Sequence, residues 1–503
     1  MLFERTILRE DLIRCALCED APCTAACGQL PVAKILRSVW FDDEKVAAAR
    51  LPERLPCVSC SAHCESACVR PREVPIWKLM MRLHGRVKPE LEVDLPQGDD
   101  LLKTDLCGIP LESPFLLSSS VVASTYDMCA RAFEAGWAGA AFKTICSFDI
   151  HEASPRFSAI TGDNGTIVGF KNVEQLSDHS VAENMEIFRR LKQDFPTKFI
   201  LASIMGQNEA EWEELSRLCE ENGADAIELN FSCPNMMDDG LGSDIGQVPE
   251  LVERFTAAAR RGAKIPILAK LTPNVAAMSP AAEAAKRGGA DGIVAINTIK
   301  SIIGVSPHTY VSTPAVRGMS AVGGYSGTAV KPIALRFIAE LGKNPKLQGL
   351  HVSAMGGIET WRDALEFIHR GAGSIQVTTA VMQYGYRIIE DLKAGLAYYL
   401  AEKGFGSVKE ARGLALDSIS DTTDVLERDT VVFPKFHREK CIGCGRCVIS
   451  CADGGHQAIR LDEDRRPILD GKKCVGCHLC VLVCPQRAIS SSRKRISRSR
   501  KDS

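Results

Sequence analysis

Residues 226–298 contain three short apolar runs, each of which ends in polar residues: AIELNFSCPN from Ala226, PILAKLTPN from Pro266 and GIVAINT from Gly292. Stretches with the spacing of amphipathic helices lie between them. Continuous apolar strands that alternate with amphipathic helices are typical of a parallel sheet covered by helices. This stretch therefore predicts consecutive βα units.

The same pattern extends to both sides of this stretch. Five further runs of the same kind are FLLSSS from Phe115, GAAFKT from Gly139, KFILASI from Lys198, GLHVSAMGG from Gly349 and SIQVTTA from Ser374. Eight repeats suit a closed (β/α)8 barrel better than an open doubly wound sheet, which would usually carry a G-x-G-x-x-G fingerprint after a strand. Because the chain lacks that motif, we predict the α/β fold class, with a TIM barrel over residues 100–400 and no nicotinamide site on this chain.

Two cysteine runs near the C-terminus repeat the spacing C-x2-C-x2-C-x3-C. They consist of Cys441, Cys444, Cys447 and Cys451, and of Cys474, Cys477, Cys480 and Cys484. This is the bacterial two-cluster ferredoxin pattern, in which the fourth cysteine of each run ligates the cluster of the other run. The tight loops need small residues, here Gly443, Gly445 and Gly476. Since zinc sites rarely use this spacing, it predicts a ferredoxin-like domain with two 4Fe-4S clusters over residues 431–490.

Two less regular cysteine runs lie near the N-terminus: Cys15, Cys18, Cys23 and Cys27, then Cys57, Cys60, Cys64 and Cys68. Eight thiolates suffice for two more 4Fe-4S clusters, with ligands shared between the runs, and a pair of zinc sites is the alternative. A disulfide framework is not expected, because the charged start MLFERTILREDLIR has no apolar core of the kind that a signal peptide needs. We predict an N-terminal helical iron–sulfur domain over residues 1–85.

The composition is ordinary for a multidomain chain of 503 residues: 45% hydrophobic, 25% charged and a net charge of −2. No apolar run approaches the roughly 18 residues of a membrane helix, and the charge leaves no basic footprint for nucleic acid. We therefore expect a cytoplasmic protein that binds neither membrane nor nucleic acid. Residues 401–430 are predicted to form a helical linker, and the basic residues 491–503 a disordered tail.

The active site of such a barrel lies at the carboxyl ends of its strands. The polar residues that end the predicted strands include Lys143, Thr144, Asn230, Ser232, Cys233, Lys270, Asn297, Thr298, Gly356, Gly357, Thr378 and Thr379. The last four would make a phosphate cradle, and Lys270 would place positive charge near the N1–C2 oxygen of a flavin. Because clusters pass single electrons and most carbon substrates need two, this pattern predicts FMN at the barrel mouth.

The segments VGFKNVEQL, ELNFSCPN, AKLTPN, AINT, GGYSGTAVKPIALRF and GGIETW resemble the FMN and iron–sulfur catalytic subunits of bacterial NAD-dependent dihydropyrimidine dehydrogenases. The resemblance covers about residues 100–490. The N-terminal block is similar to the iron–sulfur domain of the long eukaryotic enzyme and of glutamate synthase small subunits. The resemblance implies reversible, FMN-dependent reduction of the C5–C6 double bond of uracil or thymine, with electrons supplied through the clusters.

The resemblance also implies roles for individual residues. Cys233 would be the catalytic acid at C5, and a buried strand-end thiol is the alternative. The pyrimidine, whose ring alternates acceptors and donors that carboxamides can match, would be held by Asn172, Glu174, Asn230, Ser232, Asn297 and Thr298. The FMN would be bound by Ser119, Lys143, Thr144, Lys270, Ser326, Gly327, Gly356, Gly357, Thr378 and Thr379.

This chain departs from the long enzyme, because the cysteine block joins the barrel without FAD and nicotinamide domains between them. We therefore expect an FAD- and NAD(P)-binding flavoprotein subunit, or a ferredoxin-like donor, to dock near the N-terminal clusters, in a homodimer or heterotetramer. One alternative is a reductase of another cyclic imide or conjugated carbonyl compound, such as a dihydroorotate-like ring, although no predicted substrate contact is basic. The other is an electron-transfer subunit that retains the barrel as a scaffold.

Overall fold

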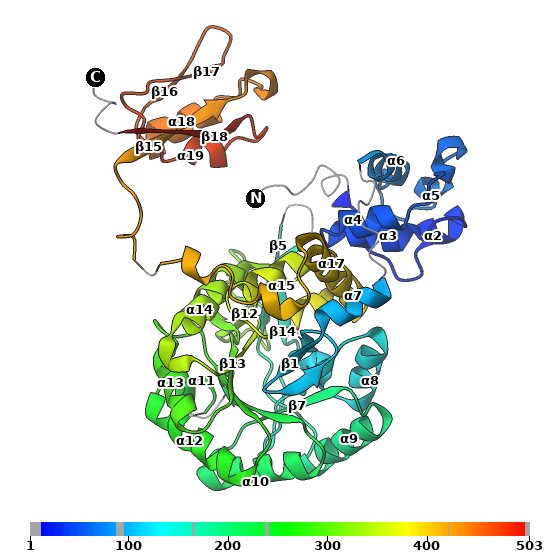
Figure 1. Ribbon diagram of the computed structural model, residues 1–503, viewed down its shortest axis with the longest axis vertical. Helices are drawn as coiled ribbons and strands as arrows, with labels where there is room; N and C mark the ends of the chain where they lie inside the picture. Colours follow the sequence, from blue (N-terminus) through cyan, green and yellow to red (C-terminus); the bar gives the residue numbers. More distant parts are fainter. Residues whose placement is uncertain (1–11, 87–94, 163–165, 237–240, 421, 498–503) are drawn as a thin grey trace. The chain divides into compact units, whose positions relative to one another are not determined.

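The structure is a computed structural model that describes residues 12–86, 95–162, 166–236, 241–420 and 422–497 (Figure 1). It contains two compact units, Met1–Ser418 and Ile419–Ser503. The first unit holds the N-terminal cysteine block and the predicted barrel, and the second holds the C-terminal cysteine runs. None of the helices in the described residues is long and apolar enough to cross a membrane.

Eight parallel strands form a closed barrel in the order β10-β13-β14-β3-β4-β7-β8-β9. All eight are predicted strands, so the TIM-barrel prediction is confirmed. Their bounds are β3 Phe115–Leu117, β4 Gly139–Ala141, β7 Phe199–Ile204, β8 Ala226–Phe231, β9 Ile267–Leu271, β10 Gly292–Ala295, β13 His351–Ala354 and β14 Ser374–Val377.

A helix follows each barrel strand and covers the outside of the barrel (Figure 1). These helices are α8 Tyr126–Ala135, α9 Val181–Asp194, α10 Glu209–Glu221, α12 Pro249–Gly262, α13 Ser279–Arg287, α14 Lys331–Lys343, α15 Trp361–Ile368 and α17 Ile388–Lys403. Polar side chains start several of them: Ser180 and Glu183 form a capping box at α9, and Asn208 caps α10. The apolar faces of these helices pack against the barrel strands. For example, the ring centroids of Trp212 in α10 and Phe231 in β8 lie 5.1 Å apart.

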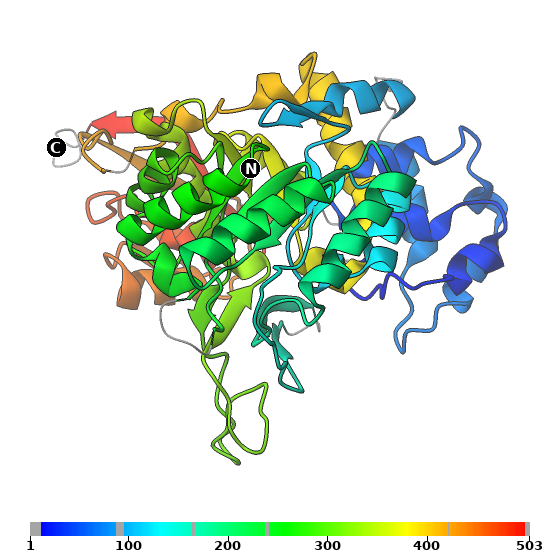
Figure 2. The same cartoon turned by 90° about the horizontal axis from the view of Figure 1, so that it is seen from below.

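Insertions after β4 and β10 build a second sheet that the sequence did not predict. Its antiparallel strands run in the order β11-β12-β6-β5, with bounds β5 Phe157–Thr161, β6 Ile167–Asn172, β11 Ile299–Ser301 and β12 Gly323–Ser326. The light green segment between β11 and β12 projects from the barrel (Figure 2). Two short helices, α11 Ser243–Gly246 and α16 Thr379–Tyr384, follow β8 and β14. These insertions stand at the carboxyl ends of the barrel strands.

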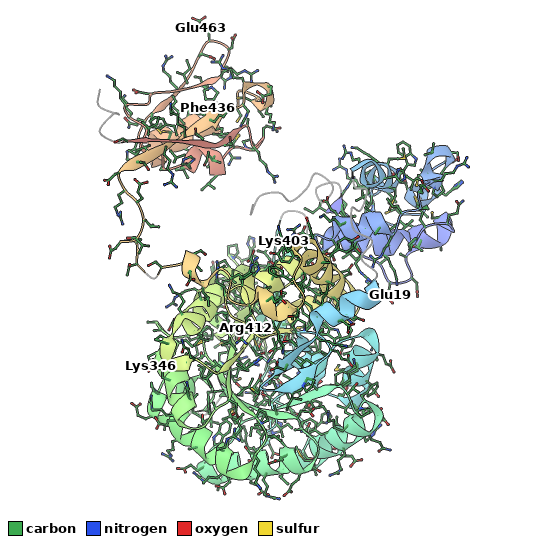
Figure 3. All side chains as sticks on the ribbon, in the orientation of Figure 1. Glu19, Lys346, Lys403, Arg412, Phe436 and Glu463 are labelled. Carbon is green, nitrogen blue, oxygen red and sulfur yellow. The ribbon has the colours of Figure 1, made fainter. Side chains whose placement is uncertain are left out.

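The described part of the N-terminal block is helical and packs on the barrel. Its elements are α2 Pro22–Cys27, α3 Val32–Trp40, α4 Glu44–Ala49, η1 Pro56–Ser59, α5 His63–Ser66 and α6 Ile76–Arg86. Arg37 of α3 pairs with the buried Asp391 of α17 at 2.6 Å, and the ring of Phe41 lies 5.2 Å from that of Tyr384. Glu19, labelled in Figure 3, pairs with Arg387 at 2.8 Å.

Helix α7, Leu95–Leu102, and the antiparallel pair β1 Thr104–Leu106 and β2 Ile109–Leu111 lead into the barrel. The predicted N-terminal domain begins with residues 1–11, which lie outside the described residues.

The second unit has the ferredoxin-like arrangement that the cysteine spacing predicts. Strand β15, Thr430–Phe436, pairs with β18, Ile489–Ser497, and β16, Ile459–Leu461, pairs with β17, Pro467–Leu469. Helices α18, Arg446–Gly454, and α19, Leu479–Leu482, start within the two cysteine runs. Gly443, Gly445 and Gly476 have φ angles of 68°, 75° and 74°, which is the backbone conformation that favours glycine at these tight turns.

Two predictions about the chain outside the domains are wrong in part. Residues 491–497 are not a disordered tail but belong to β18, because Ile496 pairs with Val431 and the strand extends the ladder with β15; residues 498–503 lie outside the described residues. The linker over 401–430 is only partly helical: α17 ends at Lys403, and only short 3-10 turns follow. Its Asp, Ser and Thr residues compete for backbone hydrogen bonds and so disfavour a helix.

Candidate active site and cluster sites

A cavity opens where the barrel strands end, with about 1160 Å³ of empty space including its mouth. Its walls come from the ends of β4, β8, β9, β10, β13 and β14, and from β6 and β12 of the second sheet. Sixteen of the seventeen residues predicted to bind substrate or FMN, or to act as the acid, line this cavity. The exception is Ser232.

The floor of the cavity carries a buried ion pair. Lys270 Nζ donates to Glu228 Oε1 at 3.1 Å and to Ser119 Oγ at 2.9 Å. Ser203 Oγ also donates to Glu228 Oε1, at 2.9 Å. The side chains of Lys270 and Glu228 are 3% and 0% exposed, so a positive charge is held at the base of the cavity beside a carboxylate that does not line it.

Three glycines let the backbone approach closely at one end of the cavity. Gly327, Gly356 and Gly357 have φ angles of 90°, 118° and 78°. A Cβ on Gly357 would lie 2.9 Å from the carbonyl oxygen of Gly327 and 2.8 Å from Cβ of Lys331. The hydroxyls of Thr379 and Ser326 lie nearby and share a hydrogen bond of 2.9 Å. A space that a Cβ would fill, bordered by hydroxyls, fits the phosphate of FMN.

Ser232, which was predicted to contact the substrate, is fully buried and does not line the cavity. Its hydroxyl donates to Asn230 Oδ1 at 3.0 Å and accepts from Asn297 Nδ2 at 2.9 Å. Asn230 Nδ2 donates in turn to Thr144 Oγ1 at 2.8 Å. Ser232 therefore orients the two carboxamides that do line the cavity, because each amide has one end fixed by it.

Asn172 and Glu174 approach from the second sheet. Asn172 Oδ1 accepts from Asn235 Nδ2 at 3.0 Å, and Glu174 Oε1 accepts from Lys143 Nζ at 3.0 Å. Burial raises the pKa of Glu174 above its usual value, although Lys143 acts in the opposite direction. Glu152 lies 3.5 Å from Lys143 as well. Arg156 Nη1 lies 3.4 Å from Glu174 and 3.6 Å from Glu152, so two cations and two carboxylates offset one another at this end of the cavity.

Cys233 stands directly after β8 and lines the cavity. Burial raises the pKa of its thiol to about 11, although Lys270 acts in the opposite direction. The thiol is therefore protonated at neutral pH and has a proton to give.

Several cavity residues were not predicted. Gln175, Asn235, Tyr325, Met355 and Gln376 line the cavity, and Glu228 supports Lys270 from below. Asn235 belongs to the SCPN motif, and Glu228 shares a strand face with Asn230. Gln175 and Tyr325 lie in the quoted segments VGFKNVEQL and GGYSGTAVKPIALRF, next to the predicted Glu174 and Ser326.

The C-terminal cysteines gather into two groups of four around separate cavities. Cys484 joins Cys441, Cys444 and Cys447 around one cavity, and Cys451 joins the first three cysteines of the second run around the other. This is the exchange of fourth ligands that the ferredoxin pattern predicts. Both groups fit 4Fe-4S clusters.

The N-terminal cysteines exchange their fourth members in the same way. Cys68 and the first three cysteines of the first run line one cavity, where burial, together with the nearby Cys18, Cys23 and Cys68, raises the pKa of Cys15. Cys27 interacts instead with Cys57 and Cys64. Each run thus contributes its fourth cysteine to the other group, and the two groups fit two clusters.

Comparison with known proteins identifies relatives for both units. Residues 101–400 match the model of the dihydroorotate dehydrogenase family, and residues 435–490 match the 4Fe-4S dicluster domain. The chain is 52% identical over 365 residues to the NAD-dependent dihydropyrimidine dehydrogenase subunit PreA of Escherichia coli, covering 73% of this chain and 89% of that protein.

Two further relatives widen the comparison. The chloroplastic dihydropyrimidine dehydrogenase (NADP(+)) of Arabidopsis thaliana is 34% identical over 352 residues, covering 67% of this chain and 82% of that protein. The catalytic subunit of dihydroorotate dehydrogenase B (NAD(+)) of Pyrococcus abyssi is 38% identical over 322 residues, covering 63% of this chain and 99% of that protein. The closed barrel, its cavity and these matches show that this chain belongs to the dihydroorotate dehydrogenase family, with a 4Fe-4S dicluster domain joined to its barrel.

Proposed function

We propose that this chain is the catalytic subunit of a dihydropyrimidine dehydrogenase. It reduces the C5–C6 double bond of uracil or thymine on FMN, in a reversible reaction. The observation that carries the proposal is the single cavity in which Asn172, Asn230, Asn297, Glu174 and Cys233 meet. The relationship to two dihydropyrimidine dehydrogenases at 52% and 34% identity supports the same reaction.

In this proposal, different residues of the cavity bind the pyrimidine, donate the proton and lie beside the flavin. Asn230 and Asn297, oriented by Ser232, offer carboxamides to the alternating carbonyl and N–H groups of the pyrimidine. The Cys233 thiol, protonated at neutral pH, donates the proton to C5. FMN, when bound, supplies the hydride that C6 receives and accepts electrons one at a time. Lys270 holds positive charge on the cavity floor, where the flavin ring would lie.

The cysteine groups provide the electron supply in this proposal. Four 4Fe-4S clusters, two in each cysteine block, carry electrons to the FMN. A partner flavoprotein subunit with FAD and a nicotinamide site, or a ferredoxin-like donor, delivers electrons to the N-terminal clusters. The relative from E. coli is itself named as a subunit of an NAD-dependent enzyme, which supports a partner of that kind.

A dihydroorotate-like substrate fits the cavity less well. Orotate carries a carboxylate that needs a free cation, but Lys143 pairs with Glu174 and Glu152, and Lys270 pairs with Glu228. We therefore assign the neutral pyrimidines as substrates.

The assignment can be tested by turnover with an artificial one-electron donor. Reduced viologen would drive the purified, cluster-loaded chain anaerobically with uracil, thymine or orotate, and loss of donor absorbance would report the rate. We expect turnover of uracil or thymine that exceeds the rate for orotate. Faster turnover of orotate than of both pyrimidines would contradict the assignment.

A further inference from the structure

The ion pair on the cavity floor has one member that no binding role explains. Glu228 lies on β8 two residues before Asn230, on the same strand face, and its side chain is fully buried. It does not line the cavity. A buried carboxylate costs free energy unless its charge is paired and its oxygens are hydrogen-bonded, so its presence here needs a reason.

Hydrogen bonds hold the carboxylate of Glu228 next to Lys270. Oε1 accepts from Lys270 Nζ at 3.1 Å and from Ser203 Oγ at 2.9 Å, and Oε2 accepts from Gln376 Nε2 at 3.4 Å. The two neutral donors come from β7 and β14, on either side of the barrel interior. The carboxylate is thus fixed from both sides beneath the lysine.

Lys270 in turn has only one other partner among the described contacts, Ser119 Oγ at 2.9 Å. A lone lysine beside a flavin stabilises the reduced ring, which carries negative charge, and so raises the reduction potential. A carboxylate 3.1 Å from Nζ in a buried site cancels much of that positive charge. The potential of a bound flavin therefore depends on the pair and not on the lysine alone.

We propose that Glu228 is a positioning residue that offsets the charge of Lys270, lowers the reduction potential of the bound FMN and thereby biases the site toward pyrimidine reduction. Reduction delivers a hydride, two electrons and a proton, to C6 and a second proton to C5, and the two electrons arrive singly from the clusters. A lower flavin potential favours this direction over oxidation of the dihydropyrimidine. The direction of the bias rests on the proposed function, whereas the effect on the potential does not.

The test is an anaerobic redox titration of FMN in the full-length holoenzyme, monitored by flavin absorbance with reference dyes. In Glu228→Gln we expect a more positive midpoint potential, with the balance between reduced and oxidised flavin moved about tenfold toward reduced; for a two-electron couple this is about 30 mV. Glu228→Asp, which keeps the charge but withdraws it from Lys270, should shift the potential less and in the same direction. Glu283→Gln makes the same chemical change at the pair with Lys346 and should leave the potential unchanged.

The outcomes separate the two claims. An unchanged or more negative potential in FMN-loaded Glu228→Gln would overturn the role of Glu228, whatever the substrate. If that variant does not retain FMN, Glu228→Asp decides the question by the same criterion. A positive shift in a protein that reduces neither uracil nor thymine would leave the role of Glu228 intact and contradict the proposed function.

The same variants give a kinetic readout. The ratio of uracil reduction to dihydrouracil oxidation, measured at equal donor and acceptor concentrations, should fall in Glu228→Gln relative to the unmodified chain. A ratio that stays the same while the potential shifts would contradict the directional bias.

Discussion

Cys233 holds its proton at neutral pH, because burial raises the pKa of the thiol to about 11. Replacement by Ala removes this proton donor while leaving the carboxamides and the glycine cradle in place. We expect Cys233→Ala to lower kcat for uracil reduction by about 10²- to 10⁴-fold with FMN content unchanged. Steady-state turnover and flavin content of the purified variant provide the measurement.

Cys219 offers a matched control for that variant. It is also a buried thiol, on α10, and does not line the cavity. Cys219→Ala should keep normal turnover. Normal turnover in Cys233→Ala would show that its thiol is not the acid.

The raised pKa of Cys233 also sets a pH dependence. A group whose pKa is about 11 stays protonated through neutral and mildly alkaline pH and loses its proton only as the pH approaches that value. We expect the rate of uracil reduction in single-turnover experiments to show no loss from thiol ionisation between pH 7 and about pH 9. A decline centred near the ordinary thiol pKa, about 8.5, that is absent from Cys233→Ser would contradict this account.

Most residues that the strand-end rule selected line the cavity, and Ser232 is the one that does not. Positions 230 and 232 would share a face in a continuous strand, but β8 ends at Phe231, so Ser232 turns behind the wall. Glu228 was overlooked for a different reason, since sequence spacing shows which strand end a residue occupies and not which residue supports it from below.

Among the elements, the loop after β13 depends on Gly357. A Cβ at this position meets the backbone of Gly327 and the side chain of Lys331, and its φ of 78° costs a non-glycine residue about 1–2 kcal/mol. We expect Gly357→Ala to lower the FMN bound per chain. The flavin released on denaturation measures this directly.

Gly385 provides the control for the cradle. Its φ is 80°, but a Cβ there meets no atom within 4 Å, so Gly385→Ala introduces backbone strain without the crowding. Equal loss of FMN in both variants would show that backbone strain, and not the shape of the cradle, is responsible.

The projecting segment between β11 and β12 is fastened by Lys171 of β6. The fully buried Nζ donates to the carbonyl oxygens of Thr313 at 3.1 Å and Ala321 at 2.7 Å, and burial lowers the pKa of this lysine. Lys171→Met would leave those carbonyls unpaired, at a cost of about 1–3 kcal/mol.

We expect faster hydrogen exchange in residues 302–322 of Lys171→Met, together with a higher KM for uracil, because Asn172 is the next residue on the same strand. The exposed Lys300 of β11 is the control, and Lys300→Met should change neither quantity. Unaltered exchange in Lys171→Met would mean that the segment is held by other contacts.

The elements that the sequence predicted and those it missed differ in composition. The eight barrel strands are mostly apolar and are buried along their length, so their apolar runs were visible in the sequence. The strands of the second sheet are short, polar or glycine-rich and only partly buried. β5 pairs with its neighbour β6, and β11 pairs with β12, but the two pairs are joined into one sheet only by contacts between segments more than 100 residues apart, such as Gly324 with Asn172, which local periodicity cannot reveal.

For the whole molecule, the division of the N-terminal cysteines between two clusters is directly testable. Cys27 and Cys64 fall in one group, whereas Cys68 falls in the other. The double variant Cys27→Ser with Cys64→Ser should lose one cluster, about four of about sixteen irons. The double variant Cys64→Ser with Cys68→Ser should lose two. Equal iron content in the two variants would contradict this division of ligands.

The domain order was readable from the sequence, because each block has its own pattern: cysteine runs at both ends and alternating apolar runs between them. The join between the N-terminal block and the barrel was not. It rests on single long-range contacts such as Arg37 with Asp391 and Phe41 with Tyr384. The local sequence around an Arg or a Phe does not reveal which distant residue it contacts.

The central claim is that this chain reduces pyrimidines, and one anaerobic experiment tests it most directly. The purified chain, loaded with FMN and clusters, would be reduced with dithionite, freed of excess reductant and mixed with uracil or thymine while flavin and cluster absorbance are followed. We predict reoxidation, with one dihydropyrimidine formed for every two electrons lost. No reoxidation by either pyrimidine, in protein shown to hold FMN and about sixteen irons, would contradict the assignment.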